Sequence, residues 1–435
     1  MKPSAKVVTR FAPSPTGLLH GGNYRTAVFA YLYAKKEAGE FILRIEDTDR
    51  ARNKKEYEDN ILETLSWLGL SYDHFYRQSE HAARHRELLE RLLEEGKAYI
   101  SKEEPKEEGQ RGEVIRFKNP NRVVTFTDLV RGEISMDTTD LGDFVIARSL
   151  DEPVFHFAVV VDDADEGVTH VVRGEDHISN TPRQILIGES LGLPIPTYAH
   201  LPLVLGPDKT KLSKRRGAKA LTQYRDQGYL PEALINYLAL LGWHPEGEQE
   251  LFSVAELIRA FELSRIQKGS GIFDEVKLAW FNGEHIKRLS NEDFAAQLQA
   301  FVGSPIDMHL VPLIKERAQT LAEGKALLSE YDFSAANPSR ETLLAGAKAE
   351  AEAVRVHLEK VVELTAALPD ESFTGAVVKD ALFAYATEVG RSAVLWPMRV
   401  ALSGKEKSPD PFTLAALLGK AETLARLQKA LAVLK

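Results

Sequence analysis

The chain has 435 residues, 44% of them hydrophobic and 27% charged, which is an ordinary globular composition and excludes a fibrous or wholly disordered protein. Its length predicts roughly three compact units. No apolar run approaches the roughly 18 residues needed to cross a bilayer, and no apolar signal core precedes the first prolines, so we expect a cytoplasmic protein without a membrane partner. The absence of cysteine excludes disulfides, thiol nucleophiles and thiolate metal sites.

The formal net charge is −9, so any contact with nucleic acid must come from a local basic patch. One such patch lies between residues 205 and 226, where seven Lys or Arg stand against two Asp. It is the sharpest charge feature of the chain.

The first part of the chain predicts strands that alternate with helices of apolar periodicity. Strands are expected at residues 7–12 and 41–46, and helices at 23–36 and 54–68. This order predicts a parallel sheet.

From about residue 79 the pattern changes to a charged helix and short alternating strands up to about residue 147, which indicates an insertion. The parallel pattern returns with a strand at 169–173, a helix whose start is marked by a capping Asn180 and by Pro182, and a strand at 198–205. After residue 221 the chain is predicted to be helical, with breaks, to its end.

The turn at residues 13–23 lies between a parallel strand and the helix that follows it. Ligands of such sheets bind beyond the carboxyl ends of the strands, where a helix start offers backbone N–H groups to phosphate. His20 and Asn23 could therefore hydrogen-bond phosphate oxygens in a transition state, and Gly21 and Gly22 permit close approach. A polar turn without chemistry is the alternative.

The basic loop at residues 206–217 carries several cations between Gly and Pro residues. They cannot all be neutralised locally, which favours a polyanion such as nucleotide phosphate or RNA, with a solvated surface loop as the alternative. The loop lacks the spacing of a Walker motif, and no dinucleotide-binding glycine pattern follows a strand.

Charged residues also stand at strand ends, where Arg10 and Arg173 must either pair with internal carboxylates or bind an acidic ligand. Asp162 and Asp163 are adjacent like a metal-binding pair, but no further ligand has convincing spacing around them.

Taken together, these motifs resemble class I aminoacyl-tRNA synthetases. SPTGLLHGGN is similar to their HIGH signature and KLSKR to their KMSKS signature. RFAPSPTG, FILRIEDTDR, VVVDDADEGVTHVVRGEDHISNTPRQ and YRDQGYLPEALINYLALLGW resemble, in order, bacterial-type glutamyl-tRNA synthetase over roughly residues 6 to 290. The helical remainder resembles the anticodon-binding part of that family in length and character.

The resemblance implies an α/β fold: a Rossmann-like parallel-sheet catalytic domain with an α+β insertion, followed by mostly α-helical stem-contact and anticodon-binding domains. The implied boundaries are 1–78 and 161–220 for the two catalytic halves, 79–160 for the acceptor-binding insertion, 221–310 for the stem-contact domain and 311–435 for the anticodon-binding domain.

It also implies that L-glutamate and ATP form glutamyl-adenylate and pyrophosphate, and that glutamate then passes to the 3′-terminal adenosine of tRNA-Glu. The implied catalytic residues are His20, Asn23, Lys211 and Lys214. Expected ATP contacts are His20, Gly22, Asp176, His177, Val204, Lys211, Ser213, Lys214 and Arg215. Expected glutamate contacts are Arg10, Ala12, Ser14, Glu46, Phe155 and Arg173, with arginine for the carboxylates and Glu46 for the ammonium group.

Mg²⁺ is expected with ATP, and zinc is not expected, because the cysteine-based zinc site of some relatives cannot form here. We expect a monomer, and whether tRNA-Gln is also charged stays open. Phe155 stands where the family usually has Tyr, so a hydroxyl that helps position glutamate is missing. The Gly21-Gly22 pair is a second departure from the first signature.

Three alternatives stay open at this point. A truncated tRNA-modifying glutamyl transferase would lack the helical region from residue 311. A catalytically silent paralogue would have damaged signatures, yet His20, Lys211 and Lys214 are present. A small nucleotidyltransferase would be shorter and would carry a second His where this chain has Asn23.

Overall fold

The structure is a computed structural model that describes residues 6–49, 51–103, 112–213, 217–333 and 336–435. The chain divides into two compact units, Met1–His285 and Ile286–Lys435. None of the helices within the described ranges is both long and apolar enough to cross a membrane.

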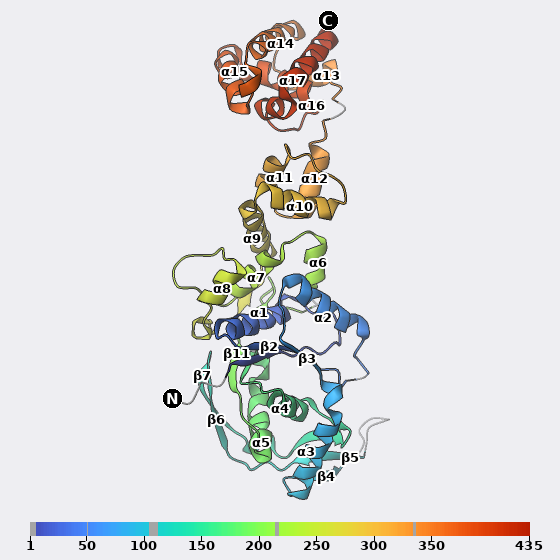
Figure 1. The fold of residues 1–435 in the computed structure, drawn as a ribbon, viewed down its shortest axis with the longest axis vertical. Helices are drawn as coiled ribbons and strands as arrows, with labels where there is room; N and C mark the ends of the chain where they lie inside the picture. The colour runs from blue at the N-terminus through green and yellow to red at the C-terminus, as the bar shows by residue number, and fades with distance from the viewer. Residues whose placement is uncertain (1–5, 50, 104–111, 214–216, 334–335) are drawn as a thin grey trace. The chain divides into compact units, whose positions relative to one another are not determined.

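The first unit is built on a seven-stranded sheet with the strand order β3-β2-β1-β10-β11-β6-β7. Figure 1 labels β2, β3, β6, β7 and β11 of this sheet. All neighbouring strands are parallel except the last pair, β6 and β7, which form an antiparallel hairpin. The strands are β1 (Val8–Phe11), β2 (Glu40–Ile45), β3 (His74–Arg77), β6 (Val123–Asp128), β7 (Gly132–Asp137), β10 (His170–Gly174) and β11 (Thr197–Leu201). The predicted parallel sheet is therefore confirmed.

Side chains of the sheet alternate between two hydrophobic cores, as the pleat of a strand dictates. On β2, Phe41 and Leu43 belong to one core and Ile42 to the other. The first core includes side chains of α1 (Gly21–Lys36), α2 (Lys55–Leu68), α6 (Leu221–Asp226), α7 (Pro231–Leu240) and α8 (Val254–Ala260), and the second those of α3 (Ala82–Glu94), α4 (Phe155–Asp165) and α5 (Thr181–Leu191). Helices thus cover both faces, as in doubly wound α/β folds.

The segment predicted as an insertion forms a second sheet of four antiparallel strands and also adds to the central one. The second sheet contains β4 (Ala98–Lys102), β5 (Glu113–Phe117), β8 (Phe144–Ser149) and β9 (Glu152–Pro153). The strands β6 and β7, which lie between β5 and β8 in the sequence, belong instead to the central sheet, where Asp128 pairs with Tyr198 of β11. Part of the inserted segment therefore belongs to the central sheet itself.

Two local predictions were wrong. The strand expected at 198–205 is broken at Pro202, and its second part, β12 (Val204–Leu205), pairs instead with β13 (Gly271–Ile272). Asn180 does not cap α5 with its side chain, because a 3-10 helix (Glu175–Asn180) runs directly into α5 and leaves Asn180 in a helical conformation. Its amide lies 3.2 Å from Nδ1 of His177 instead.

The second unit is helical throughout its described residues, apart from the connections. Its helices are the end of α9 (Glu275–Arg288), α10 (Asn291–Val302), α11 (Val311–Arg317), α12 (Leu321–Glu330), α13 (Arg340–Ala345), α14 (Ala351–Ala366), α15 (Gly375–Val389), α16 (Arg391–Ser403) and α17 (Pro411–Leu434). Side chains of Ser290, Thr320, Ser339, Thr374 and Asp410 each cap the start of one helix. These caps satisfy backbone N–H groups that the helix itself leaves unpaired.

Candidate active site

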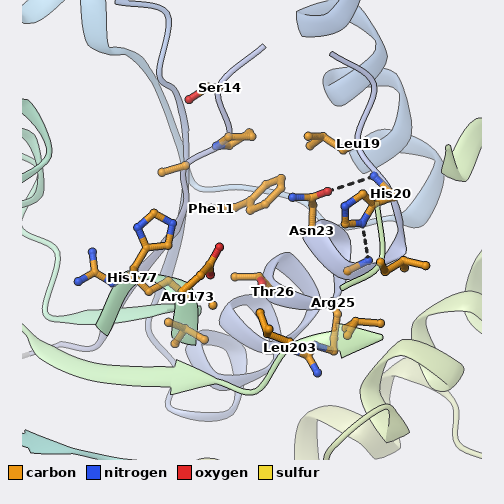
Figure 2. A pocket seen from close by; sticks show the side chains of 18 of the residues that line it. Phe11, Ser14, Leu19, His20, Asn23, Arg25, Thr26, Arg173, His177 and Leu203 are labelled. Atoms are coloured by element: carbon orange, nitrogen blue, oxygen red, sulfur yellow. Dashed lines mark hydrogen bonds between the residues drawn. The ribbon is translucent and has the colours of Figure 1, made fainter. Parts of the chain in front are cut away.

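A cavity of about 600 Å³ lies in the first unit, beyond the carboxyl ends of β1 and β10. The helices that follow these two neighbouring strands, α1 and α5, contribute to opposite cores, so the cavity sits at the switch point where α/β sheets bind ligands. Its size is that of a pocket for a small molecule or cofactor. Figure 2 shows Arg173 and His177 on one side of it and His20 and Asn23 on the other.

Most of the predicted site residues line this one cavity, although they come from segments up to about 200 positions apart. The predicted residues that line it are Arg10, Ala12, Ser14, His20, Gly22, Asn23, Glu46, Phe155, Arg173, Asp176, His177, Val204 and Lys211. Ser213 does not line it and borders a neighbouring pocket of the same loop. Lys214 and Arg215 lie outside the described residues.

His20 is the N-cap of α1, and its conformation is set by two reciprocal hydrogen bonds (Figure 2). Its Nδ1 accepts a hydrogen bond from the backbone N–H of Gly22 at 3.1 Å, and Oδ1 of Asn23 accepts one from the backbone N–H of His20 at 3.1 Å. Because Nδ1 is an acceptor, the proton of the neutral ring is on Nε2. The first turn of α1 therefore fixes His20 as a hydrogen-bond donor.

The two glycines of this turn are needed for space rather than for an unusual backbone angle. A Cβ at Gly22 would lie 3.0 Å from Cε1 and 3.1 Å from Nδ1 of His20, and one at Gly21 would lie 2.7 Å from Cε2 of Phe273. A side chain at Gly22 would therefore push the His20 ring aside by a few tenths of an ångström.

On the basic loop, Lys211 forms a 2.7 Å ion pair with Asp176, which follows β10. Burial would raise the pKa of Asp176, but the hydrogen bond from Lys211, its charge and smaller neighbouring contributions together keep that pKa below its ordinary value. Beside it, burial and Arg173 lower the pKa of His177 to about 4, so this ring is neutral at neutral pH. The loop and β10 thus meet at one polar wall of the cavity.

Arg173 is a buried cation, 6% exposed, that forms no ion pair within the described residues. Its hydrogen bonds go to neutral acceptors, Nε2 of His200 at 3.1 Å and Oγ1 of Thr181 at 2.8 Å. Burial lowers its pKa to about 10, which still leaves the guanidinium charged at neutral pH. A buried charge without a counter-ion is costly, so this position favours an anionic ligand.

Around Glu46, which is 7% exposed, carboxylates outnumber arginines. The fully buried Arg44 contacts Glu46 at 3.3 Å, Asp163 at 2.7 Å and Glu166 at 2.7 Å, and Asp163 also pairs with Arg10 at 3.1 Å. Two arginines thus serve three carboxylates, leaving one excess negative charge. Burial raises the pKa of Glu46, with Arg44 and Arg10 offsetting part of that rise. A ligand cation beside Glu46 would restore the balance.

Sequence reasoning missed several residues that matter here. Thr26, Pro202 and Leu203 line the cavity without any recognisable motif. Arg44 and Asp163 form ion pairs with the cavity residues Glu46 and Arg10. In the sequence Arg44 was marked only as a charged residue inside a predicted strand, and Asp163 only as a member of an unexplained Asp pair. Among the described residues, no group of three or more His, Asp or Glu could hold a metal ion.

Comparisons with known proteins first define the class. The family model of the catalytic domain of class I tRNA synthetases (E and Q) matches residues 6–113 and 101–280, and that of an anticodon-binding domain matches residues 272–431. The fold class expected from the sequence is therefore confirmed.

The individual relatives are more specific. A glutamate–tRNA ligase of Oleidesulfovibrio alaskensis is 42% identical, covering 99% of this chain and all of the relative, and one of Aquifex aeolicus is 50% identical over 66% of this chain and 68% of the relative. The crystal structure of a glutamate tRNA ligase from Elizabethkingia meningosepticum in complex with its amino acid has a TM-score of 0.86 at 32% identity, covering 99% of this chain and all of that one. The chain belongs to the glutamate–tRNA ligase family of class I aminoacyl-tRNA synthetases, so the expected family and enzyme class are confirmed.

Proposed function

We propose that this chain activates L-glutamate with ATP to glutamyl-adenylate, releasing pyrophosphate, and then transfers glutamate to the 3′-terminal adenosine of tRNA-Glu. The observation that carries the proposal is the charge pattern of the cavity. A buried cation without a counter-ion, Arg173, lines the same space as Glu46, which belongs to a buried network of three carboxylates and two arginines. An amino acid offers the two complementary charges.

Glutamate binding follows from this pattern. Arg173 takes one carboxylate of the substrate, and Arg10, already partly neutralised by Asp163, takes the other. The ammonium group lies beside Glu46. Ala12, Ser14 and Phe155 complete the wall around the substrate.

ATP occupies the side of the cavity formed by His20, Gly22, Asn23 and Val204, with Asp176 and His177 nearby. The glutamate carboxylate oxygen attacks the α-phosphorus, and the bond from this phosphorus to the pyrophosphate oxygen breaks. His20 and Asn23 donate hydrogen bonds to phosphate oxygens as the transition state forms, and one such donor is typically worth about 3 kcal/mol.

Lys211 stabilises the leaving pyrophosphate, together with Lys214, Ser213 and Arg215 of the same loop. To do so Lys211 exchanges its 2.7 Å pair with Asp176 for a phosphate oxygen. Both partners are about half exposed, so this exchange costs little. Mg²⁺ enters as part of the ATP substrate, since it is usually held by phosphates and water.

The helical region supports a tRNA partner, because an anticodon-binding family model matches residues 272–431. We keep the boundaries 1–78, 79–160, 161–220, 221–310 and 311–435 as proposals for the catalytic halves, insertion, stem-contact and anticodon-binding domains. A monomer acting in the cytoplasm, where ATP and tRNA meet, is proposed as well. Whether tRNA-Gln is a second substrate is an outcome of the test below.

The test is glutamate-dependent exchange between ATP and labelled pyrophosphate, run with no tRNA, with tRNA-Glu and with tRNA-Gln. Exchange that requires glutamate supports the adenylate step, and transfer of labelled glutamate to tRNA-Glu supports the second. Exchange driven equally by aspartate or glutamine would overturn the substrate assignment. The variant Arg173→Gln tests the proposed carboxylate contact, because it removes the charge of that side chain. We expect it to raise the KM for glutamate much more than the KM for ATP.

A further inference from the structure

The candidate carboxylate-binding residue Arg173 is held from behind by a side chain that does not line the cavity. Nε of Arg173 donates to Nε2 of His200 at 3.1 Å, and Nη2 of Arg173 donates to Oγ1 of Thr181 at 2.8 Å. His200, on β11, is fully buried. Since the Nε bond sets the plane of a guanidinium, His200 controls the direction in which Arg173 presents its outer N–H groups.

His200 is in turn held by Asp128, at the end of β6. Oδ2 of Asp128 lies 2.6 Å from Nδ1 of His200 and accepts the backbone N–H of the same residue at 3.0 Å. The other oxygen accepts the backbone N–H groups of Val130 and Arg131. With every acceptor site of this 1% exposed carboxylate aimed at a fixed donor, Asp128 cannot turn away.

The chain of donors leaves one protonation state for the ring. The carboxylate of Asp128 needs a proton on Nδ1, and the N–H of Arg173 needs a lone pair on Nε2, so His200 is neutral and carries its proton on Nδ1. Burial lowers the pKa of His200, and Arg173 lowers it further against the opposing effect of Asp128. Oγ1 of Thr181 also lies 3.1 Å from Nε2 of His200, and the rings of Tyr198, stacked on it, and Phe126 have their centroids 5.9 Å and 6.3 Å away.

We infer that Asp128 and His200 are positioning residues for substrate recognition: they hold Arg173 with its outer N–H groups aimed at a carboxylate of the substrate. The inference rests on the proposed function of the cavity and adds two residues that do not line it. It also gives the inserted hairpin a part in amino-acid binding, because Asp128 comes from β6.

Two variants of His200 test this inference as a matched pair. Asparagine is short, so His200→Asn keeps an N–H near Asp128 and loses the acceptor for Arg173. Glutamine is longer, so His200→Gln places an amide oxygen where Nε2 of His200 lies and keeps that acceptor. We expect His200→Asn to raise the KM for glutamate about tenfold or more, the usual effect of losing a hydrogen bond to a charged group. The KM for ATP should stay within about twofold, and His200→Gln should recover most of the loss.

The outcomes separate this inference from the proposed function. No glutamate-dependent exchange by the unaltered chain would overturn the proposed function, whatever the variants do. Normal exchange together with an unchanged glutamate KM in His200→Asn, or equal losses in both variants and for both substrates, would overturn the positioning role alone.

A measurement on the unaltered chain keeps the inference falsifiable if a variant fails to fold. In nitrogen NMR spectra the His200 ring, assigned through its contact with Tyr198, should carry its proton on Nδ1 and respond when glutamate is added. A proton on Nε2 would contradict the hydrogen bond to Arg173 and overturn the inference.

Discussion

The buried network behind Glu46 makes the stability of the first unit depend on pH. Two arginines, Arg10 and Arg44, face three carboxylates, and Oε1 of Glu166 is buried without a hydrogen-bond partner in the described part of the chain. Burial raises the pKa of Glu166 from its ordinary 4.5 to about 7, with Arg44 opposing that rise. A proton taken up by Glu166 removes the excess negative charge.

The raised pKa of Glu166 determines the direction and the magnitude of the change in stability with pH. Because the folded-state pKa is raised, the folded protein binds more protons than the unfolded chain between the two values, so stability is lost as the pH rises through 7. At about 1.4 kcal/mol per pKa unit, the loss between pH 5 and pH 8 amounts to about 2.5 kcal/mol. Glu166→Gln keeps a hydrogen-bond acceptor for Arg44 and cannot titrate. The free energy of unfolding of this variant, measured relative to that of the unaltered chain, should therefore rise by about 2.5 kcal/mol between pH 5 and pH 8.

The assay is urea unfolding at pH values from 5 to 8, followed by tryptophan fluorescence in a Trp396→Phe background. This substitution leaves Trp67, Trp243 and Trp280, all in the first unit, as reporters. Glu133→Gln, at an exposed position of β7, is the control for charge removal at a solvated site. A stability difference between Glu166→Gln and the unaltered chain that stays constant from pH 5 to pH 8 would refute the reasoning.

Three further predictions concern the cavity. Phe155→Tyr should lower the KM for glutamate about two- to tenfold in the exchange assay, the worth of one neutral hydrogen bond, and an unchanged KM would show that the missing hydroxyl is not needed. Gly22→Ala should lower the rate of adenylate formation about tenfold or more, because the added Cβ displaces the His20 ring. The control is Gly269→Ala, whose added Cβ meets open space. Equal rates in the two variants would contradict the steric account. Glutamate binding near pH 7 should release protons from Glu166, because the substrate ammonium supplies the missing positive charge; calorimetry in buffers of different ionisation enthalpy measures this, and a buffer-independent heat would exclude it.

Much of the fold could be predicted from local pattern. The alternation of apolar strands and amphipathic helices is encoded within short windows, so β1, α1, β2 and α2 appear close to their predicted bounds. The departure of β6 and β7 from the inserted sheet could not be predicted, because it depends on pairing between residues about 70 positions apart. The failure of the predicted Asn180 cap has a local cause, since a 3-10 helix precedes α5 without leaving an extended residue at the junction.

For the site, the residues that line the cavity were easier to predict than the residues behind them. His20 and Asn23 were predicted from the rule that ligands bind at the carboxyl ends of parallel strands, and Arg173 from its charge at a strand end together with the family resemblance. The partners of Asp162 and Asp163 could not be predicted in this way, because they come from distant segments. Asp162 contacts His85 at 2.7 Å, and Asp163 contacts Arg44 at 2.7 Å. Residues whose function is to balance a buried charge have no spacing that a sequence window can detect.

The hairpin of β6 and β7 has a consequence for engineering and for the evolution of this scaffold. An inserted region that only contacts RNA could be exchanged between relatives as a cassette, joined at its two ends. Here such an exchange would expose the edge of β11 to pairing with other molecules and would take Asp128 away from the interior. Chimeras that replace the region should therefore keep residues 123–137 with the parent sheet and change only the four-stranded part.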